Sequence, residues 1–186
     1  MSNFIRTFTG RHITPTAPRS EDICIEDIAH ALSQLCRANG HFKAFFSVAQ
    51  HSVNCCLEAE ARDYSQEVRL ACLLHDAGEA YLSDVTRPVK VLLPDYSKYE
   101  DVLLHMIWDK FLPRPLAPDE AKLVFEVDDC MLYYEFRHFM DERLFDRAPR
   151  RHGVQDFSEK PMAEVEQQFL KLFAELREIG MPEKSK

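Results

Sequence analysis

The chain has 186 residues, of which 46% are hydrophobic and 29% are charged, and its formal net charge is −8. These values are typical of one globular domain. The acidic balance excludes nonspecific binding to a nucleic acid polymer, because negatively charged side chains repel its phosphates. Only five residues are glycine, which disfavours a fold with many tight turns.

The six cysteines contain no Cys-x-x-Cys pair, so we expect neither a redox dithiol nor a thiolate zinc site. Most of them lie within apolar helical patterns and read as small buried hydrophobes, which indicates a reducing cytoplasm. The first residues lack the apolar core of a signal peptide, and no apolar stretch is long enough to span a bilayer. We therefore expect a cytoplasmic protein without membrane association.

The hydrophobic pattern predicts an all-α fold with a short β-hairpin at the N-terminus. Residues 3–14 alternate around Thr9-Gly10, as expected for two strands and a turn. Apolar residues at helical spacing then predict a helix from Ile25 to Cys36, which Gly40 would stop. A second helix covers about residues 47–62.

Four later helices are predicted between proline-rich or polar segments: from near Ser65 through residue 79, over about 96–111, over about 118–145, and over about 161–180. Residues 83–94 and 147–160 read as loops. No internal repeat and no linker divides the chain. We expect a single domain over residues 1–186, with its core at about 24–146 and a C-terminal helix at about 161–180.

A polar group ends an apolar run in the third helix. His75 and Asp76 follow Cys72-Leu-Leu directly, and Glu79 comes four residues after His75. A buried His-Asp pair is costly without a partner, and a divalent metal is one partner that neutralises both. His51 in the second helix and Asp128 in the long helix supply further ligand types.

Taken alone, His51 is also explained as a histidine in the core that is hydrogen-bonded to the protein. Asp129 is an alternative to Asp128 as the carboxylate ligand from the long helix. Two imidazoles and two carboxylates suit Zn²⁺, Co²⁺, Mn²⁺ or Fe²⁺. The set of four therefore favours one divalent transition metal over separate structural roles.

The order His51, His75-Asp76, Asp128 resembles the H…HD…D signature of the HD-domain metal-dependent phosphohydrolases. Residues 50–52, 75–79, 83–90 and 127–128 are similar to the bacterial 5′-deoxynucleotidases of that superfamily and to the related small phage deoxyadenosine triphosphohydrolases. The resemblance covers roughly residues 24–140. It implies an HD-domain helical bundle.

The resemblance also implies a role for each matched residue. Four residues would bind the metal: His51, His75, Asp76 and Asp128. Glu79 would orient or deprotonate the water that attacks phosphorus, and Asp84 would lie near the substrate sugar. Substrate-binding positions would be Arg37, Asn39, His41, Pro88 and Lys90.

The sequence departs from the family between Arg37 and His51. The segment after Arg37, Ala38-Asn39-Gly40-His41, is about one residue shorter and lacks the family's usual tryptophan. Arg37 has a second reading as a cation that caps the first helix. The register of Arg37, and any base selectivity inferred from it, therefore stay open.

The implied substrates are 2′-deoxynucleotides, foremost the 5′-monophosphates, with a dATP-type triphosphohydrolase as the rival. A triphosphate would need more cations, and the obvious supply is Arg37, Arg87, Lys90 and Lys122. Two more distant alternatives remain. A di-iron oxygenase would need extra ligands, for which His105 is the sole candidate between Asp76 and Asp128, and a non-catalytic nucleotide-binding module would need none. A homo-oligomer, a dimer or larger, is expected from the resemblance.

Overall fold

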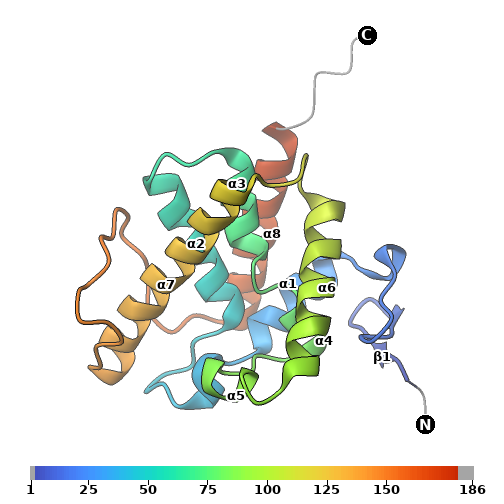
Figure 1. Ribbon diagram of the computed structural model, residues 1–186, viewed down its shortest axis with the longest axis horizontal. Helices are drawn as coiled ribbons and strands as arrows, with labels where there is room; N and C mark the ends of the chain where they lie inside the picture. Colours follow the sequence, from blue (N-terminus) through green and yellow to red (C-terminus); the bar gives the residue numbers. More distant parts are fainter. Residues whose placement is uncertain (1–2, 180–186) are drawn as a thin grey trace.

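Helix α2 (Val48–Ala61) lies at the centre of the fold (Figure 1). The structure is a computed structural model and describes residues 3–179. Four helices pack around α2: α1 (Ile25–Gln34), α3 (Gln66–Leu74), α7 (Pro118–Met140) and α8 (Met162–Ile179). All residues from 48 to 56 are buried as a result. Buried polar side chains on such a helix need partners inside the protein, so the polar residues of α2 show where its polar contacts with other segments lie.

The N-terminal hairpin is confirmed. Strand β1 (Ile5–Arg6) pairs antiparallel with β2 (His12–Ile13), and Gly10 adopts a φ of +88° in the turn. Thr9 fastens the hairpin to α1, because its amide and hydroxyl donate to the Asp27 carboxylate at 2.7 and 2.9 Å. A single 3₁₀ turn, η1 (Ser20–Asp22), connects the hairpin to α1. The chain is thus mostly helical with one small sheet, as predicted.

Helix α1 ends at Gln34, two residues earlier than predicted. Leu35 is extended, and its carbonyl accepts a hydrogen bond from Val48, while the Arg37 amide donates to Phe46. Residues 35–37 thus pair with the segment that leads into α2. These backbone hydrogen bonds replace those of a continued helix, although the apolar spacing predicted one. The 3₁₀ turn η2 (Arg37–Gly40) follows.

The His75–Glu79 segment is not one continuous helix, contrary to the prediction. Helix α3 ends at Leu74, and the next hydrogen bonds run three residues back, from Ala77 to Leu74 and from Glu79 to Asp76. A one-turn helix, α4 (Glu79–Leu82), follows. The tighter winding changes the direction of Glu79 relative to a straight α-helix.

Two further boundaries differ from the predictions. The expected loop at 83–94 contains a single helical turn, α5 (Arg87–Lys90), before α6 (Pro94–Phe111). The long helix α7 ends at Met140 and not at 145, because Asp141 adopts a left-handed φ of 55° and closes it. None of the described helices combines the length and apolar character needed to cross a membrane.

The irregular segment at 141–161 is attached to α2 by polar side chains spaced one helical turn apart. The Gln50 amide donates to the carbonyl of Ser158 at 2.9 Å, and the Asn54 amide donates to that of Asp156 at 3.0 Å. Glu58, fully buried, accepts from the amide of Gly153 at 2.9 Å. One face of α2 therefore positions this segment, whereas the neighbouring face carries His51.

Candidate metal centre and its cavity

Four side chains from three helical regions bring their donor atoms together. His51 Nε2 from α2 lies 3.1 Å from His75 Nε2 after α3, and 3.2 Å from Asp128 Oδ1 on α7. Asp76 Oδ2 lies 3.1 Å from His75 Nε2 and 3.7 Å from His51 Nε2. Donors that each lie about 2.0–2.2 Å from one ion are separated by about 3 to 3.6 Å at angles of 90–110°. The observed spacing therefore fits a single transition-metal ion.

The two imidazoles are held so that their free nitrogens face each other. His51 Nδ1 donates to Glu135 Oε1 at 2.6 Å, and His75 Nδ1 donates to the Cys72 carbonyl at 2.8 Å. With both Nδ1 protons assigned to these acceptors, the two neutral rings would present Nε2 lone pairs that repel across 3.1 Å unless a proton or a metal ion lies between them. A shared cation between them removes this repulsion. Hydrogen-bonded Nδ1 atoms are also the usual support for metal-binding histidines.

The surrounding carboxylates favour positive charge at this point. Burial acts to lower the pKa of His75, but the charges of Asp76 and Asp128 overcome it and raise that pKa well above its usual range. For Asp128, burial acts to raise the pKa, but hydrogen bonds from His51 and His75 hold it well below its usual range. The cluster therefore holds two carboxylates that remain ionised at neutral pH.

Cys55 also borders the cluster. Its Sγ lies 3.5 Å from His51 Nε2, and the donor atoms of His51, Cys55 and His75 all lie within 4.8 Å of one another. Cys55 is fully buried, and burial raises the pKa of its thiol well above the usual value. The sequence pattern indicated only a small buried hydrophobe here, because Cys55 stands among other apolar residues.

Arg37 contacts two carboxylates of the cluster and its surroundings, Asp76 and Glu135. Its Nη1 donates to Asp76 Oδ2 at 3.3 Å, and its Nε lies 3.2 Å from Glu135 Oε2. The side chain is only 9% exposed. Burial opposes the charge of Arg37, but Glu135 and Asp76 more than compensate and raise its pKa. Arg37 thus does not cap α1, and it lies beside the donor set as the resemblance implied.

Glu79 is buried next to Asp76 and Asp84, close to the proposed metal donors. It is 4% exposed, and its Oε2 has no hydrogen-bond partner among the described residues. Burial, together with the charges of Asp76 and Asp84, raises the pKa of Glu79 well above its usual range. Its other oxygen lies 3.6 Å from Lys90 Nζ. A buried carboxyl with a raised pKa is suited to accept a proton near neutral pH.

Arg87 contacts the outer side of the cluster. Its guanidinium donates to Asp128 Oδ2 at 2.9 Å and lies 2.7 Å from Asp129 Oδ1. Asp128 therefore directs one oxygen to the histidines and the other to Arg87. Asp129 does not contact the histidines and pairs with Arg87 instead, which agrees with the predicted choice of Asp128.

A cavity of about 390 Å³ opens above these residues. Its charged end contains Arg37, Asp76, Glu79, Asp84, Arg87, Lys90 and Asp128. The opposite wall is apolar and consists of Phe42, Val85, Pro88, Leu132, Phe136, Leu144 and Phe145. The volume and the division into a polar and an apolar end are typical of small-molecule sites.

Seven of the eleven sequence-predicted site residues line this cavity. His51 and His75 do not line it, but they contact Asp76 and Asp128, which do. Asn39 and His41 have exposed side chains and do not line it, whereas their neighbours Ala38 and Phe42 do. Ala38 and Asn39 both have a positive φ, of 52° and 51°, and this left-handed turn directs the chain away from the cavity between the two lining residues. Pro88 and Lys90, predicted as substrate-binding positions, both line the cavity.

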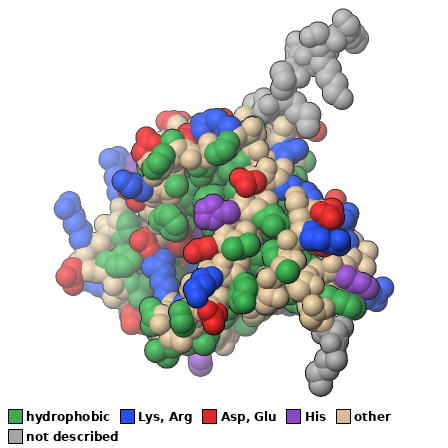
Figure 2. Space-filling model, turned by 45° about the vertical axis from the view of Figure 1, so that its right-hand side comes forward, with side chains coloured by type: hydrophobic (Ala, Val, Ile, Leu, Met, Phe, Trp, Pro, Cys, Tyr) green, Lys and Arg blue, Asp and Glu red, His purple; other side chains and the backbone are tan. Residues whose placement is uncertain are grey.

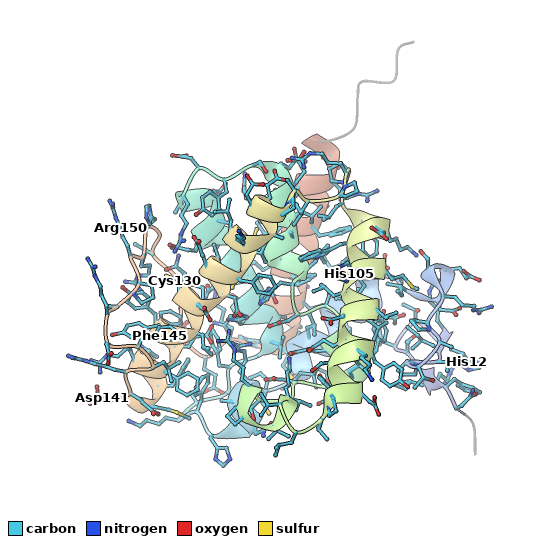
Figure 3. All side chains as sticks on the ribbon, viewed as in Figure 1. His12, His105, Cys130, Asp141, Phe145 and Arg150 are labelled. Carbon is cyan, nitrogen blue, oxygen red and sulfur yellow. The ribbon has the colours of Figure 1, made fainter. Side chains whose placement is uncertain are left out.

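His105 belongs to another part of the surface. It lies on α6, far from the cavity residue Phe145 (Figure 3). Its Nδ1 donates to the carbonyl of Asp101 at 2.7 Å, and it lines a separate hollow with Lys110. No described contact joins it to His51 or His75.

Several residues at the site were not identified from the sequence. Glu135 follows Asp128 by two helical turns on the buried face of α7, so a charged residue at this position was a usable signal. Glu100, which pairs with Lys90 at 2.5 Å, lies on a different helix, and no local sequence pattern marked it as a site residue. The apolar residues of the cavity wall were not recognisable from the sequence either, because they come from segments far apart in the chain.

No known protein-family model matches the chain. The chain is 42% identical over 120 residues to the uncharacterized protein YfdR of Escherichia coli, an alignment that covers 64% of this chain and 65% of that protein. It is 37% identical over 122 residues to an uncharacterized protein of Rhodobacter capsulatus, covering 60% of this chain and 62% of the relative. The match thus spans just under two thirds of each relative's length, and neither name states an activity.

Proposed function

We propose that this protein is an HD-domain metal-dependent phosphohydrolase that releases phosphate from 2′-deoxynucleoside 5′-monophosphates. The observation that carries the proposal is the convergence of four metal donors beside the buried, unpaired oxygen of Glu79 at the charged end of a cavity. A cytoplasmic location and a homo-oligomeric state belong to the same proposal.

His51, His75, Asp76 and Asp128 would hold one divalent ion, with Co²⁺, Mn²⁺, Zn²⁺ and Fe²⁺ as candidates. When bound, the ion would supply Lewis-acid chemistry at the phosphoryl group and a more acidic water. Glu135 and the Cys72 carbonyl keep the two imidazoles in the orientation that such binding needs.

Glu79 would take the proton from the attacking water. Its raised pKa brings a carboxyl toward the pH at which proton transfer is efficient. Lys90, 3.6 Å away, would keep part of the glutamate population ionised and would face the phosphoryl group. Asp84, which lines the same cavity, is placed to contact the sugar.

The charge balance of the cavity favours a monophosphate over a triphosphate. The three lining cations are each paired with carboxylates: Arg37 with Asp76, Arg87 with Asp128, and Lys90 with Glu79. A phosphate monoester carries about −1.5 to −2 charges near neutral pH, which one divalent ion and Arg37 can balance. A triphosphate would place further negative charge against these carboxylates. The apolar wall with Phe42 and Phe136 would receive the nucleoside.

The oxygenase and binding-module alternatives have less support. A second iron would need further ligands, and His105, the only candidate from the sequence, lines a separate hollow. A module that only binds nucleotides would have no use for a desolvated carboxyl at the metal cluster, because an unpaired buried group is costly.

A phosphate-release panel tests the proposal. Deoxy- and ribonucleoside mono-, di- and triphosphates would be assayed with Mn²⁺, Co²⁺, Zn²⁺ and Mg²⁺. We expect turnover of deoxynucleoside monophosphates, its loss in Glu79→Gln with metal still bound, and full activity in Glu126→Gln, which changes an exposed carboxylate on α7. Absence of turnover with every nucleotide, or full activity in Glu79→Gln, would contradict the proposal.

A further inference from the structure

We infer that Cys55 is a fifth metal donor, and that its sulfur binds the ion from the core side of the cluster while Asp76 and Asp128 bind it from the cavity side. This inference rests on the metal centre of the proposed function but not on the hydrolytic activity. It assigns the site a mixed nitrogen, oxygen and sulfur character.

The first argument is the position of Cys55 on the helix. His51 and Cys55 are four residues apart on α2, so their side chains project from one helical face and can chelate one ion. Cys55 Sγ lies 3.5 Å from His51 Nε2. An ion about 2.05 Å from a nitrogen and 2.3 Å from a sulfur places those donors about 3.1–3.8 Å apart at the angles of about 90–120° between neighbouring ligands of a five-coordinate ion. The observed separation is that of two ligands of one ion.

The second argument is that the surrounding donors point to a cation at the same place. His51 is fully buried, and its Nε2 faces His75 Nε2 with no protein group between them. The described contacts of Cys55 Sγ are with the His51 ring, at 3.5 Å from Nε2 and 4.0 Å from Nδ1. Since Nδ1 already donates to Glu135, the acceptor within reach of the sulfur among these contacts is Nε2, the same nitrogen that faces His75. The sulfur is directed toward the site that the imidazoles share.

The adjacent cysteine shows the alternative, in which a thiol only fills space. Cys56 is also fully buried on α2, but no described hydrogen bond or metal-donor group includes it. Burial raises the pKa of its thiol to about 12, as expected for a packed apolar side chain. The two neighbours therefore offer a matched pair, with one sulfur at the cluster and one away from it.

Sulfur ligation has a consequence for metal choice. Thiolates favour soft and borderline ions such as Zn²⁺ and Co²⁺ over Mg²⁺ and Mn²⁺, whereas carboxylates favour the latter. Binding would displace the thiol proton, which leaves to solvent through the cavity. We expect Cys55→Ala to reduce the ratio of the Co²⁺ affinity to the Mn²⁺ affinity. Metal binding itself should remain, because four donors are left.

Cobalt titration of the whole chain, followed by absorption spectroscopy, tests the inference. We expect one equivalent of Co²⁺ to give a thiolate-to-cobalt charge-transfer band, and Cys55→Ala and Cys55→Ser to lose that band while they retain visible d–d absorption. Cys56→Ala should keep both features. X-ray absorption of the zinc-loaded protein should show a sulfur neighbour at about 2.3 Å.

The outcomes separate this inference from the proposed function. One bound Co²⁺ without a charge-transfer band would overturn sulfur ligation and leave the metal centre intact. An unchanged charge-transfer band in Cys55→Ala would mean that another cysteine binds the cobalt, and it would also overturn the inference about Cys55. A Cys55-dependent band in a protein that releases no phosphate would support sulfur ligation and refute the phosphohydrolase. Failure to bind Co²⁺ would refute both.

Discussion

Glu135 Oε1 lies 2.6 Å from His51 Nδ1, and neither side chain is exposed to solvent. The second carboxylate oxygen of Glu135 lies 3.2 Å from Arg37 Nε. One buried carboxylate therefore contacts both His51, a proposed metal donor, and Arg37, a buried cation at the cavity. This arrangement couples the position of the metal ligand to that of the cation.

Replacement of Glu135 by glutamine should weaken metal binding. The amide oxygen of glutamine can still accept the hydrogen bond from His51. It carries no negative charge, however, so it neither raises the basicity of the His51 imidazole as a metal ligand nor balances the charge of Arg37. We expect a fall of about 10- to 100-fold in affinity for Zn²⁺ or Co²⁺, measured by competition with a chelating dye. Glu126→Gln on the exposed face of α7 is the control and should bind metal as the unmodified chain does. Equal affinities in the two variants would refute the role of Glu135.

Arg87 lines the cavity next to Pro88 and close to Lys90, so its replacement by alanine should affect substrate binding more than stability. Its side chain is 57% exposed, so loss of its ion pairs should change the free energy of unfolding by less than about 1 kcal/mol. One charge-assisted hydrogen bond to substrate contributes about 1.5–3 kcal/mol, which corresponds to a KM about ten times higher or more with kcat little changed. Steady-state kinetics with a deoxynucleoside monophosphate gives both values.

The control for Arg87 is Asp129→Asn. Asp129 pairs with Arg87 from outside the cluster, so its neutralisation removes no donor and leaves Arg87 free to bind substrate. KM should change by less than about twofold, since an exposed pair contributes little. An equal rise of KM in both variants would mean that Arg87 acts through Asp129 and not on the substrate.

Replacement of Ala38 by glycine should stabilise the protein. Ala38 has a φ of 52°, and the left-handed region costs a residue with a Cβ about 1–2 kcal/mol. Glycine removes that cost but loses more entropy on folding, so we expect a net gain of about 0.5–1 kcal/mol. Urea denaturation measures it. Ala31→Gly within α1 is the reference and should destabilise by about 1 kcal/mol. A loss of stability in Ala38→Gly would show that the turn is not strained.

Glu58 should make stability depend on pH. Burial acts to raise the pKa of Glu58, but the Gly153 amide and the Arg62 guanidinium lower it below its usual value. The ionised form is thus favoured by folding. This contribution is present above the unfolded-state pKa of about 4.3 and is lost as pH falls through the lower folded-state pKa.

Glu58→Gln measures that contribution. At pH 6 the variant should be about 2 kcal/mol less stable than the unmodified chain, because a charge-assisted hydrogen-bond network is lost. The difference should shrink as pH falls toward 3. Glu60→Gln, which changes a carboxylate that is 52% exposed on the same helix, should stay within about 1 kcal/mol at every pH. A constant difference between pH 6 and 3 would exclude ionisation of Glu58 as the cause.

Charged side chains of both signs are distributed over the face of the molecule drawn in Figure 2. Figure 2 shows acidic, basic and hydrophobic side chains interspersed on the visible face, without one large region of a single charge.

The sequence by itself determined the helical character of the chain and singled out the four residues that we propose as metal donors. Apolar spacing within α2 and α7 requires only neighbours one or two turns away, so the pattern is visible without the fold. His51, His75, Asp76 and Asp128 were recognisable because charged or polar residues interrupt those apolar faces. Their order along the chain then carried the resemblance.

Only the tertiary structure decided what surrounds the donors. Glu135, Cys55 and Glu100 acquire their partners through packing of α2 against α7 and of α5 against α6, which local spacing does not encode. The end of α1 likewise depends on backbone hydrogen bonds from Arg37 and Val48 to residues about ten positions away. The cavity forms where segments distant in sequence meet, so its walls, and the exclusion of Asn39 and His41 from them, follow from long-range contacts and not from any local pattern.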